Sequence, residues 1–156
     1  MKTSLTKLKL ILIVALFVFA APAAFAQSKT KVKATTHKTA PKASHRVVFD
    51  VAAADTAQQA GLMRQLNNLK RHWPDAQVEV VVHGKALGML LTAKAYKPAA
   101  LKALQEKGVV FAACQNTMRF NKVTVADLLP GVTTVPSAVA ELITKQEEGW
   151  SYLRFQ

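Results

Sequence analysis

Short apolar runs rich in β-branched residues alternate along residues 45–156 with segments in which apolar residues recur at helical spacing. The runs predict β-strands, because branched side chains pack well on a pleated sheet, and the spaced segments predict amphipathic helices. The predicted strands occupy residues 46–51, 78–82, 109–113, 132–135 and 150–155. The predicted helices begin near Asp55, Ala86, Pro98, Thr124 and Ser137. This alternation predicts an α/β fold in which helices cover both faces of a parallel sheet.

Several boundaries carry local signals. Asp55 and Gln58 have the spacing of a capping box at the start of the first helix, and Pro74 ends that helix. Thr124 and Asp127 are spaced in the same way at the start of the fourth predicted helix, and Asn116 or Thr117 is suited to cap a turn after the strand at 109–113.

Packing roles follow from the same patterns. Met63, Leu66 and Leu69 are predicted core residues of the first helix. Glu141 and Lys145 form a predicted i,i+4 ion pair on the solvent-facing side of the last helix. The strands at 78–82 and 109–113 are almost wholly apolar, as buried parallel strands are. The strand at 150–155 alternates instead, which predicts an edge strand or an oligomer contact.

The N-terminus has the features of a secretory signal peptide. Three lysines precede an apolar run from Leu10 to Ala21, and Ala24-Phe25-Ala26 offers small residues for cleavage before Gln27. The run is short for a membrane span, although an uncleaved anchor is the alternative. We expect residues 1–26 to be removed and the mature chain to be periplasmic or secreted in a bacterium, with no transmembrane segment.

The net charge of +12 is concentrated outside the predicted fold, because the first 44 residues carry eight of the 21 basic residues and no acidic residue. Residues 27–44 are rich in Lys, Thr, Ala and Ser, and are predicted to be a disordered basic tail. The tail is either a solvated spacer or a segment attracted to anionic lipid or polymer. Nucleic-acid binding is not expected, because the excess charge over residues 45–156 is small.

Cys114 is the only cysteine, which excludes an intrachain disulfide and a cysteine-rich metal site. It stands at the carboxyl end of a predicted strand, where parallel sheets bind their ligands. Asp50, His83 and residues 135–137 stand at the ends of the other strands. Backbone N–H groups after Cys114, together with Arg119 five residues on, predict an ionised and solvent-reachable thiolate. A buried, inert cysteine is the alternative.

The partners of this thiol are less defined by the sequence. His83 is a candidate proton donor, or it satisfies a loop carbonyl. Asp50 is a candidate to orient His83 or Arg119, and capping of the following turn is the alternative. The candidate binding residues are Asp50, His83, Asn116, Thr117 and Arg119. No glycine-rich phosphate loop and no metal-ligand set occurs, so neither a cofactor nor a metal is predicted.

Four ordered stretches resemble the DsrE/DsrF-like sulfur-relay family, and most closely its exported single-domain members, over residues 46–156. They are Val82-His-Gly84, Gly108 to Thr117, Asp127-Leu-Leu-Pro-Gly131 and Val135 to Leu142, followed by Gln146-Glu-Glu-Gly149. The resemblance implies a three-layer α/β/α domain, at residues 45–156, with a five-stranded, mainly parallel sheet. It also implies assembly into trimers or hexamers. Cys114 matches the position at which some members carry a persulfide.

Two functions are therefore expected. In the first, a periplasmic sulfur carrier or sulfurtransferase holds persulfide sulfur on Cys114 and exchanges it with donor and acceptor proteins. In the second, a non-catalytic oligomeric module binds a small ligand or anion, buries the aromatic residues Trp150, Tyr152 and Phe155 between subunits, and uses Cys114 for packing.

Overall fold

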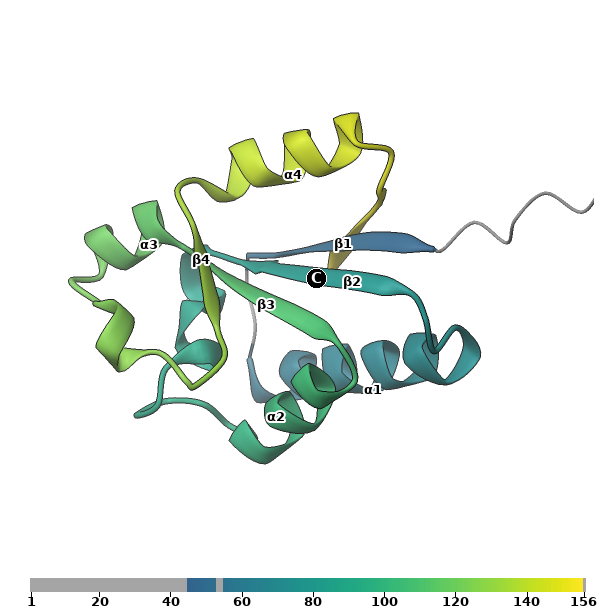
Figure 1. Ribbon diagram of the computed structural model, residues 1–156. Helices are drawn as coiled ribbons and strands as arrows, with labels where there is room; N and C mark the ends of the chain where they lie inside the picture. The colour runs from purple at the N-terminus through teal and green to yellow at the C-terminus, as the bar shows by residue number, and fades with distance from the viewer. Residues whose placement is uncertain (1–44, 53–54, 156) are drawn as a thin grey trace, which may run out of the picture. The chain divides into compact units, whose positions relative to one another are not determined.

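Five strands in the order β4-β3-β2-β1-β5 form the sheet in the computed structural model, which describes residues 45–52 and 55–155 (Figure 1). The strands are β1 (Arg46–Val51), β2 (Gln77–Val82), β3 (Val109–Cys114), β4 (Thr133–Val135) and β5 (Ser151–Phe155). All four pairings are parallel, so the predicted parallel sheet is confirmed, and β5 is an edge strand as its alternation predicted. The predicted signal peptide and basic tail lie outside the described residues.

Helices cover both faces of this sheet, which confirms the three-layer α/β/α architecture. Figure 1 shows α1 and α2 on one face and α4 on the opposite face, with α3 beyond the end of β3. The elements are α1 (Thr56–His72), η1 (Gly84–Leu90), α2 (Pro98–Glu106), α3 (Gln115–Phe120), η2 (Val125–Asp127) and α4 (Ala138–Glu147). The larger core lies under α1, α2 and η1, and a smaller one lies under α4.

The first helix forms as its sequence predicts. Asp55 accepts a hydrogen bond from the backbone N–H of Gln58 at 2.7 Å, and the Gln58 side chain accepts from the N–H of Asp55 at 2.9 Å. Met63 and Leu66 are buried and Leu69 packs against them, so the predicted core face is confirmed.

Two predicted α-helices are 3₁₀ segments instead. In η1, Ala86, Leu87, Met89 and Leu90 are all buried, so this short segment has no continuous solvent face of the kind that an amphipathic α-helix presents. In η2 the capping box predicted for Thr124 is present, but only three residues follow it before the chain becomes extended.

A buried ion pair attaches α4 to the sheet. Glu79 of β2 is 6% exposed, and its carboxylate lies 2.9 Å from Nζ of Lys145. The predicted Glu141–Lys145 pair is present at 3.4 Å, but its placement on a solvent-facing side was wrong, because Lys145 turns toward the sheet to meet Glu79. The sequence pattern did not show this, since a charged residue inside β2 has no visible partner in the sequence.

The pKa directions show how the pair is balanced. Burial raises the pKa of Glu79, and the hydrogen bond and charge of Lys145 only partly offset it. Burial acts to lower the pKa of Lys145, but the hydrogen bonds and charges of Glu79 and Glu141 outweigh it, so that pKa is raised. Each group therefore favours the charged form of the other.

Replacing Lys145 with Met should lower the free energy of unfolding at neutral pH by about 3 kcal/mol, because Glu79 is left buried without its cation. The loss should shrink as the pH falls, since the raised pKa of Glu79 makes its protonated form the one that the fold prefers. Urea denaturation measures both effects. The double variant Glu79→Leu/Lys145→Met should recover most of the stability, and Lys102→Met, on the exposed side of α2, is the matched control. Equal losses for the two lysines would contradict a role for the ion pair.

Candidate functional site

The parallel register brings Asp50, His83 and Cys114 to one edge and one face of the sheet. Asp50 pairs with Val81 in β2, and Val82 pairs with Ala113 in β3. The residues that follow Val82 and Ala113 are His83 and Cys114, which therefore stand at the same level. Because side chains alternate along a strand, all three lie on the face that α4 covers.

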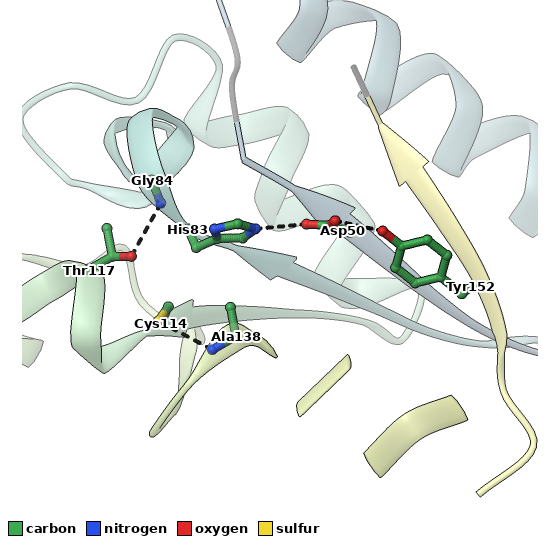
Figure 2. Close-up of polar contacts among 7 residues, drawn as sticks. All are labelled: Asp50, His83, Gly84, Cys114, Thr117, Ala138 and Tyr152. Carbon is green, nitrogen blue, oxygen red and sulfur yellow. Dashed lines mark hydrogen bonds and ion pairs between the residues drawn. The ribbon is translucent and has the colours of Figure 1, made fainter. Parts of the chain in front are cut away.

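Asp50 is the centre of a hydrogen-bonded chain at this edge. Nε2 of His83 lies 2.7 Å from Oδ1 of Asp50, and the Tyr152 hydroxyl donates to Oδ2 at 2.7 Å (Figure 2). Asp50 is 8% exposed, so these two contacts stand where water would otherwise solvate the carboxylate. Of the roles left open for Asp50, the contact with His83 fits the orienting one.

The hydrogen bonds among Tyr152, Asp50 and His83 indicate where their protons lie. The tautomer of His83 that fits a carboxylate acceptor has its hydrogen on Nε2, toward Asp50, and leaves Nδ1 as the second reactive atom of the ring. The pKa of Tyr152 is raised, first by its hydrogen bond to Asp50 and then by burial, so the phenol keeps its proton and donates it.

Gly84 fixes the position of His83 relative to α3. Its φ of +57° lies in the left-handed region, and a Cβ there would meet the carbonyl oxygen of Ala52 at 2.9 Å. Its N–H donates to the Thr117 hydroxyl at 3.2 Å. The end of β2 is therefore joined to the ends of β1 and β3 through contacts that a larger residue would displace.

Cys114 lies beside this chain, buried and surrounded by donors. The backbone N–H of Ala138 donates to its sulfur at 3.3 Å (Figure 2). Burial acts to raise the thiol pKa, but hydrogen bonds from the N–H groups of Thr117, Ala138 and Asn116 and from the Thr117 hydroxyl outweigh it, so the pKa of Cys114 is lowered. The predicted ionisation therefore has a structural basis.

The expected solvent exposure of this thiol was wrong. Cys114 is 4% exposed, because Val135 and two residues of α4, Ala138 and Leu142, close over the end of β3. The sequence could not show this, since it does not say how closely α4 follows the sheet after Pro136.

The remaining predicted residues lie on α3. The helix begins at Gln115 directly after Cys114, so the capping by Asn116 or Thr117 was wrong. Thr117 instead turns its hydroxyl toward the sheet, and the Asn116 side chain accepts a hydrogen bond from Arg119. Arg119 is exposed, and the contact that the structure records for it is this one, with Asn116 rather than with the thiol.

Tyr152 and the N–H of Ala138 are site features that the sequence analysis did not identify. The alternation along residues 150–155 predicts no partner for Tyr152, and the pairing of β5 with β1 is what brings it to Asp50. A pattern cannot give strand order, so the contact could not be found in advance.

Neither a metal-binding cluster nor a membrane-spanning helix is present in the described residues, 45–52 and 55–155. No group of three or more His, Cys, Asp or Glu side chains there is arranged to hold a metal ion. Over the same residues, the helices are too short or too polar to cross a membrane.

The fold and this edge of the sheet agree with a known family. The model of the DsrE/DsrF-like family matches residues 16–155, and the chain belongs to that family. No curated protein matches the chain.

Solved structures share the architecture. A protein of unknown function, MTH1491 from Methanobacterium thermoautotrophicum, is 32% identical, with a TM-score of 0.68 over 70% of this chain and 98% of that one. The ychN protein from E. coli is 14% identical, with a TM-score of 0.59 over 72% of this chain and 99% of that one. BT1422 from Bacteroides thetaiotaomicron, also of unknown function, is 13% identical, with a TM-score of 0.57 over 70% and 93%. The last two show the fold alone.

Replacing Thr117 with Val should raise the pKa of Cys114, because the variant keeps the side-chain volume but loses the hydroxyl that donates to the thiolate. The rate of alkylation by iodoacetamide, measured against pH, should have its midpoint at a higher pH than in the wild type, with a lower rate at neutral pH. Thr144→Val, at an exposed position of α4, is the matched control. Identical midpoints for Thr117→Val and the wild type would contradict the assigned donors.

Proposed function

We propose that the protein is a sulfur carrier that holds sulfane sulfur as a persulfide on Cys114. The observation that carries the proposal is a thiol whose pKa is lowered by hydrogen bonds from Thr117, Ala138 and Asn116 despite its burial. The thiolate is the nucleophilic form of cysteine, and these donors stabilise it. Membership of the DsrE/DsrF-like family supports sulfur relay at the level of the family.

The loading step needs no external oxidant. The Cys114 thiolate attacks the outer sulfur of a donor persulfide, R–S–SH. The donor S–S bond breaks, a new S–S bond forms on Cys114, and R–S⁻ leaves. The sulfane sulfur keeps its oxidation state because one S–S bond replaces another. Unloading is the same reaction with an acceptor thiolate as the nucleophile.

Burial of Cys114 places a condition on this reaction. The first turn of α4 supplies a donor to the sulfur and also encloses it. A donor can reach Cys114 only when that turn shifts, and the added sulfur atom then occupies the space that the shift opens. The need for this shift favours a specific protein partner over free solutes as the sulfur donor, because binding of the partner can provide the energy for the shift.

The compartment and the partners belong to the same proposal. The lysines and apolar run of residues 1–26 support export to the bacterial periplasm, or secretion. In an oxidising compartment a free thiol is at risk of mispairing, and enclosure by α4 would limit that risk. The carrier would exchange sulfur with donor and acceptor proteins and would act as a homo-oligomer, a trimer or hexamer.

Wild-type protein exposed to polysulfide should gain the mass of one sulfur atom on the peptide that contains Cys114, measured by mass spectrometry after blocking with an alkylating agent. Cys114→Ala should gain none. Denatured wild-type protein is the control for unassisted thiol chemistry, and loading of the native protein no faster than this control would overturn the proposal.

A second function is favoured by one observation, the exposed apolar surface around α4. Val139 and Ile143 of α4, Val110 of β3 and Tyr152 of β5 are each between about a third and two thirds exposed. Such residues are enriched where subunits meet. In this alternative the protein is a non-catalytic oligomeric binding module, and Cys114 is a packing residue. Phe155 does not contribute as expected, because it is already buried in the core beneath α1.

The substitution Cys114→Ala separates the two functions. A packing role predicts a loss of about 1 kcal/mol in the free energy of unfolding, as for removal of one buried heavy atom, together with a native thiol that does not react. A carrier role predicts a reactive native thiol, whatever the stability of the variant. Val139→Ser/Ile143→Ser should shift the oligomer toward the monomer in analytical ultracentrifugation, and an unchanged oligomer would exclude this surface as the interface.

A further inference from the structure

We propose that His83 is the proton donor and acceptor for sulfur exchange at Cys114, and that Asp50 and Tyr152 are the residues that position it. The inference rests on the proposed carrier function and assigns the proton chemistry of the same site. It is drawn from the hydrogen-bonded chain Tyr152–Asp50–His83, which ends at the residue level with Cys114 on the neighbouring strand.

The solvent exposure of Asp50, Cys114 and His83 shows which of these side chains an incoming molecule can reach. Asp50 and Cys114 are buried, whereas the side chain of His83 is 26% exposed. His83 is therefore the exposed member of the chain that stands next to Cys114 in the register. Tyr152, the other exposed member, lies on β5 on the far side of Asp50. Nε2 of His83 is taken by Asp50, so Nδ1 is the atom that meets the other molecule.

The structure also shows what His83 does not do. The groups that lower the pKa of Cys114 are the N–H groups and hydroxyl that surround it, and His83 is not among them. These donors are the groups that favour the thiolate form of Cys114. A histidine that stands level with the thiol and is held by a carboxylate is available for the proton of the other reactant.

The proton balance closes over one cycle. In loading, the Cys114 thiolate attacks R–S–SH, an S–S bond forms on Cys114, the S–S bond of the donor breaks, and protonated His83 gives its Nδ1 proton to the leaving sulfur, so that R–SH departs. In unloading, neutral His83 takes the proton of an acceptor thiol, whose thiolate then attacks the outer sulfur of the Cys114 persulfide. His83 is protonated again and Cys114 is again a thiolate.

Asp50 and Tyr152 act through His83. The buried carboxylate stabilises the imidazolium and fixes the ring orientation, and the Tyr152 hydroxyl holds the second carboxylate oxygen. Asp50 from β1 contacts His83, Tyr152 from β5 contacts Asp50, and Cys114 from β3 stands level with His83 in the register. Arg154 acts on the chain through its charge at Tyr152.

The test compares sulfur loading with alkylation. Loading from glutathione persulfide expels a thiolate that gains from a proton, whereas iodoacetamide expels iodide, which needs none. His83→Gln should slow loading by roughly 100-fold, the usual contribution of one general acid. Its alkylation rate should stay within about twofold of the wild-type rate, and the pH midpoint of alkylation should not move. The reason is that the variant keeps the donors that lower the pKa of Cys114.

The positioning residues have their own readout. Asp50→Asn should slow loading and leave the rate and pH midpoint of alkylation in place, because His83 loses the carboxylate that orients its ring. Tyr152→Phe should slow loading by a smaller factor, and Tyr96→Phe, at an exposed tyrosine, is the matched control.

Each outcome has a distinct meaning. If His83→Gln loads as fast as the wild type, the proton role is wrong and the carrier function stands. If loading and alkylation slow by the same factor, His83 only shapes the surroundings of Cys114, and the proposal is overturned. If the wild type takes up no sulfur, the carrier function itself fails.

Discussion

The register of three parallel strands determines where every candidate functional side chain lies. β1, β2 and β3 pair without a bulge, so their carboxyl ends stand level and alternate residues share a face. A shift of one residue in β2 would move His83 to the α1 face and separate it from Asp50. The hydrophobic pattern resists such a shift, because the same step would carry Val78, Val80 and Val82 out of the larger core.

This dependence explains which parts of the site could be predicted. The strand ends follow from apolar runs, and their common edge follows from the parallel fold, so Asp50, His83 and Cys114 were found together. Strand order is not written in local patterns, and the pairing of β5 with β1 is what adds Tyr152. The burial of Cys114 was missed for a similar reason, because it depends on how closely the first turn of α4 approaches the sheet. The inward turn of Lys145 depends on a carboxylate in another element.

The α4 face of the sheet carries an unusual load of charge for a buried surface. Asp50 and Glu79 both lie on it, each with fewer than one tenth of its surface exposed. Each carboxylate is matched, Glu79 by the cation of Lys145 and Asp50 by two hydrogen bonds. Purely apolar residues could fill these positions with equal or greater stability. The Glu79–Lys145 pair has a structural use, since it holds α4 and hence the donor N–H of Ala138 in place. The hydrogen-bonded chain Tyr152–Asp50–His83 has no such structural use, because it joins strands that are already paired.

This difference between the two buried carboxylates is the physical reason for assigning chemistry to the site. A structural carboxylate is best placed deep under a helix with a cation, as Glu79 is. Asp50 is placed at the end of a strand, and its chain leads outward through a half-exposed tyrosine and a partly exposed histidine. The thiol beside it is enclosed but keeps a lowered pKa, because the donors around the sulfur outweigh its burial. Enclosure keeps the nucleophile from solvent oxidants, and the histidine extends the reach of the site to the surface. The two features are useful together only if a second reactant binds at this edge.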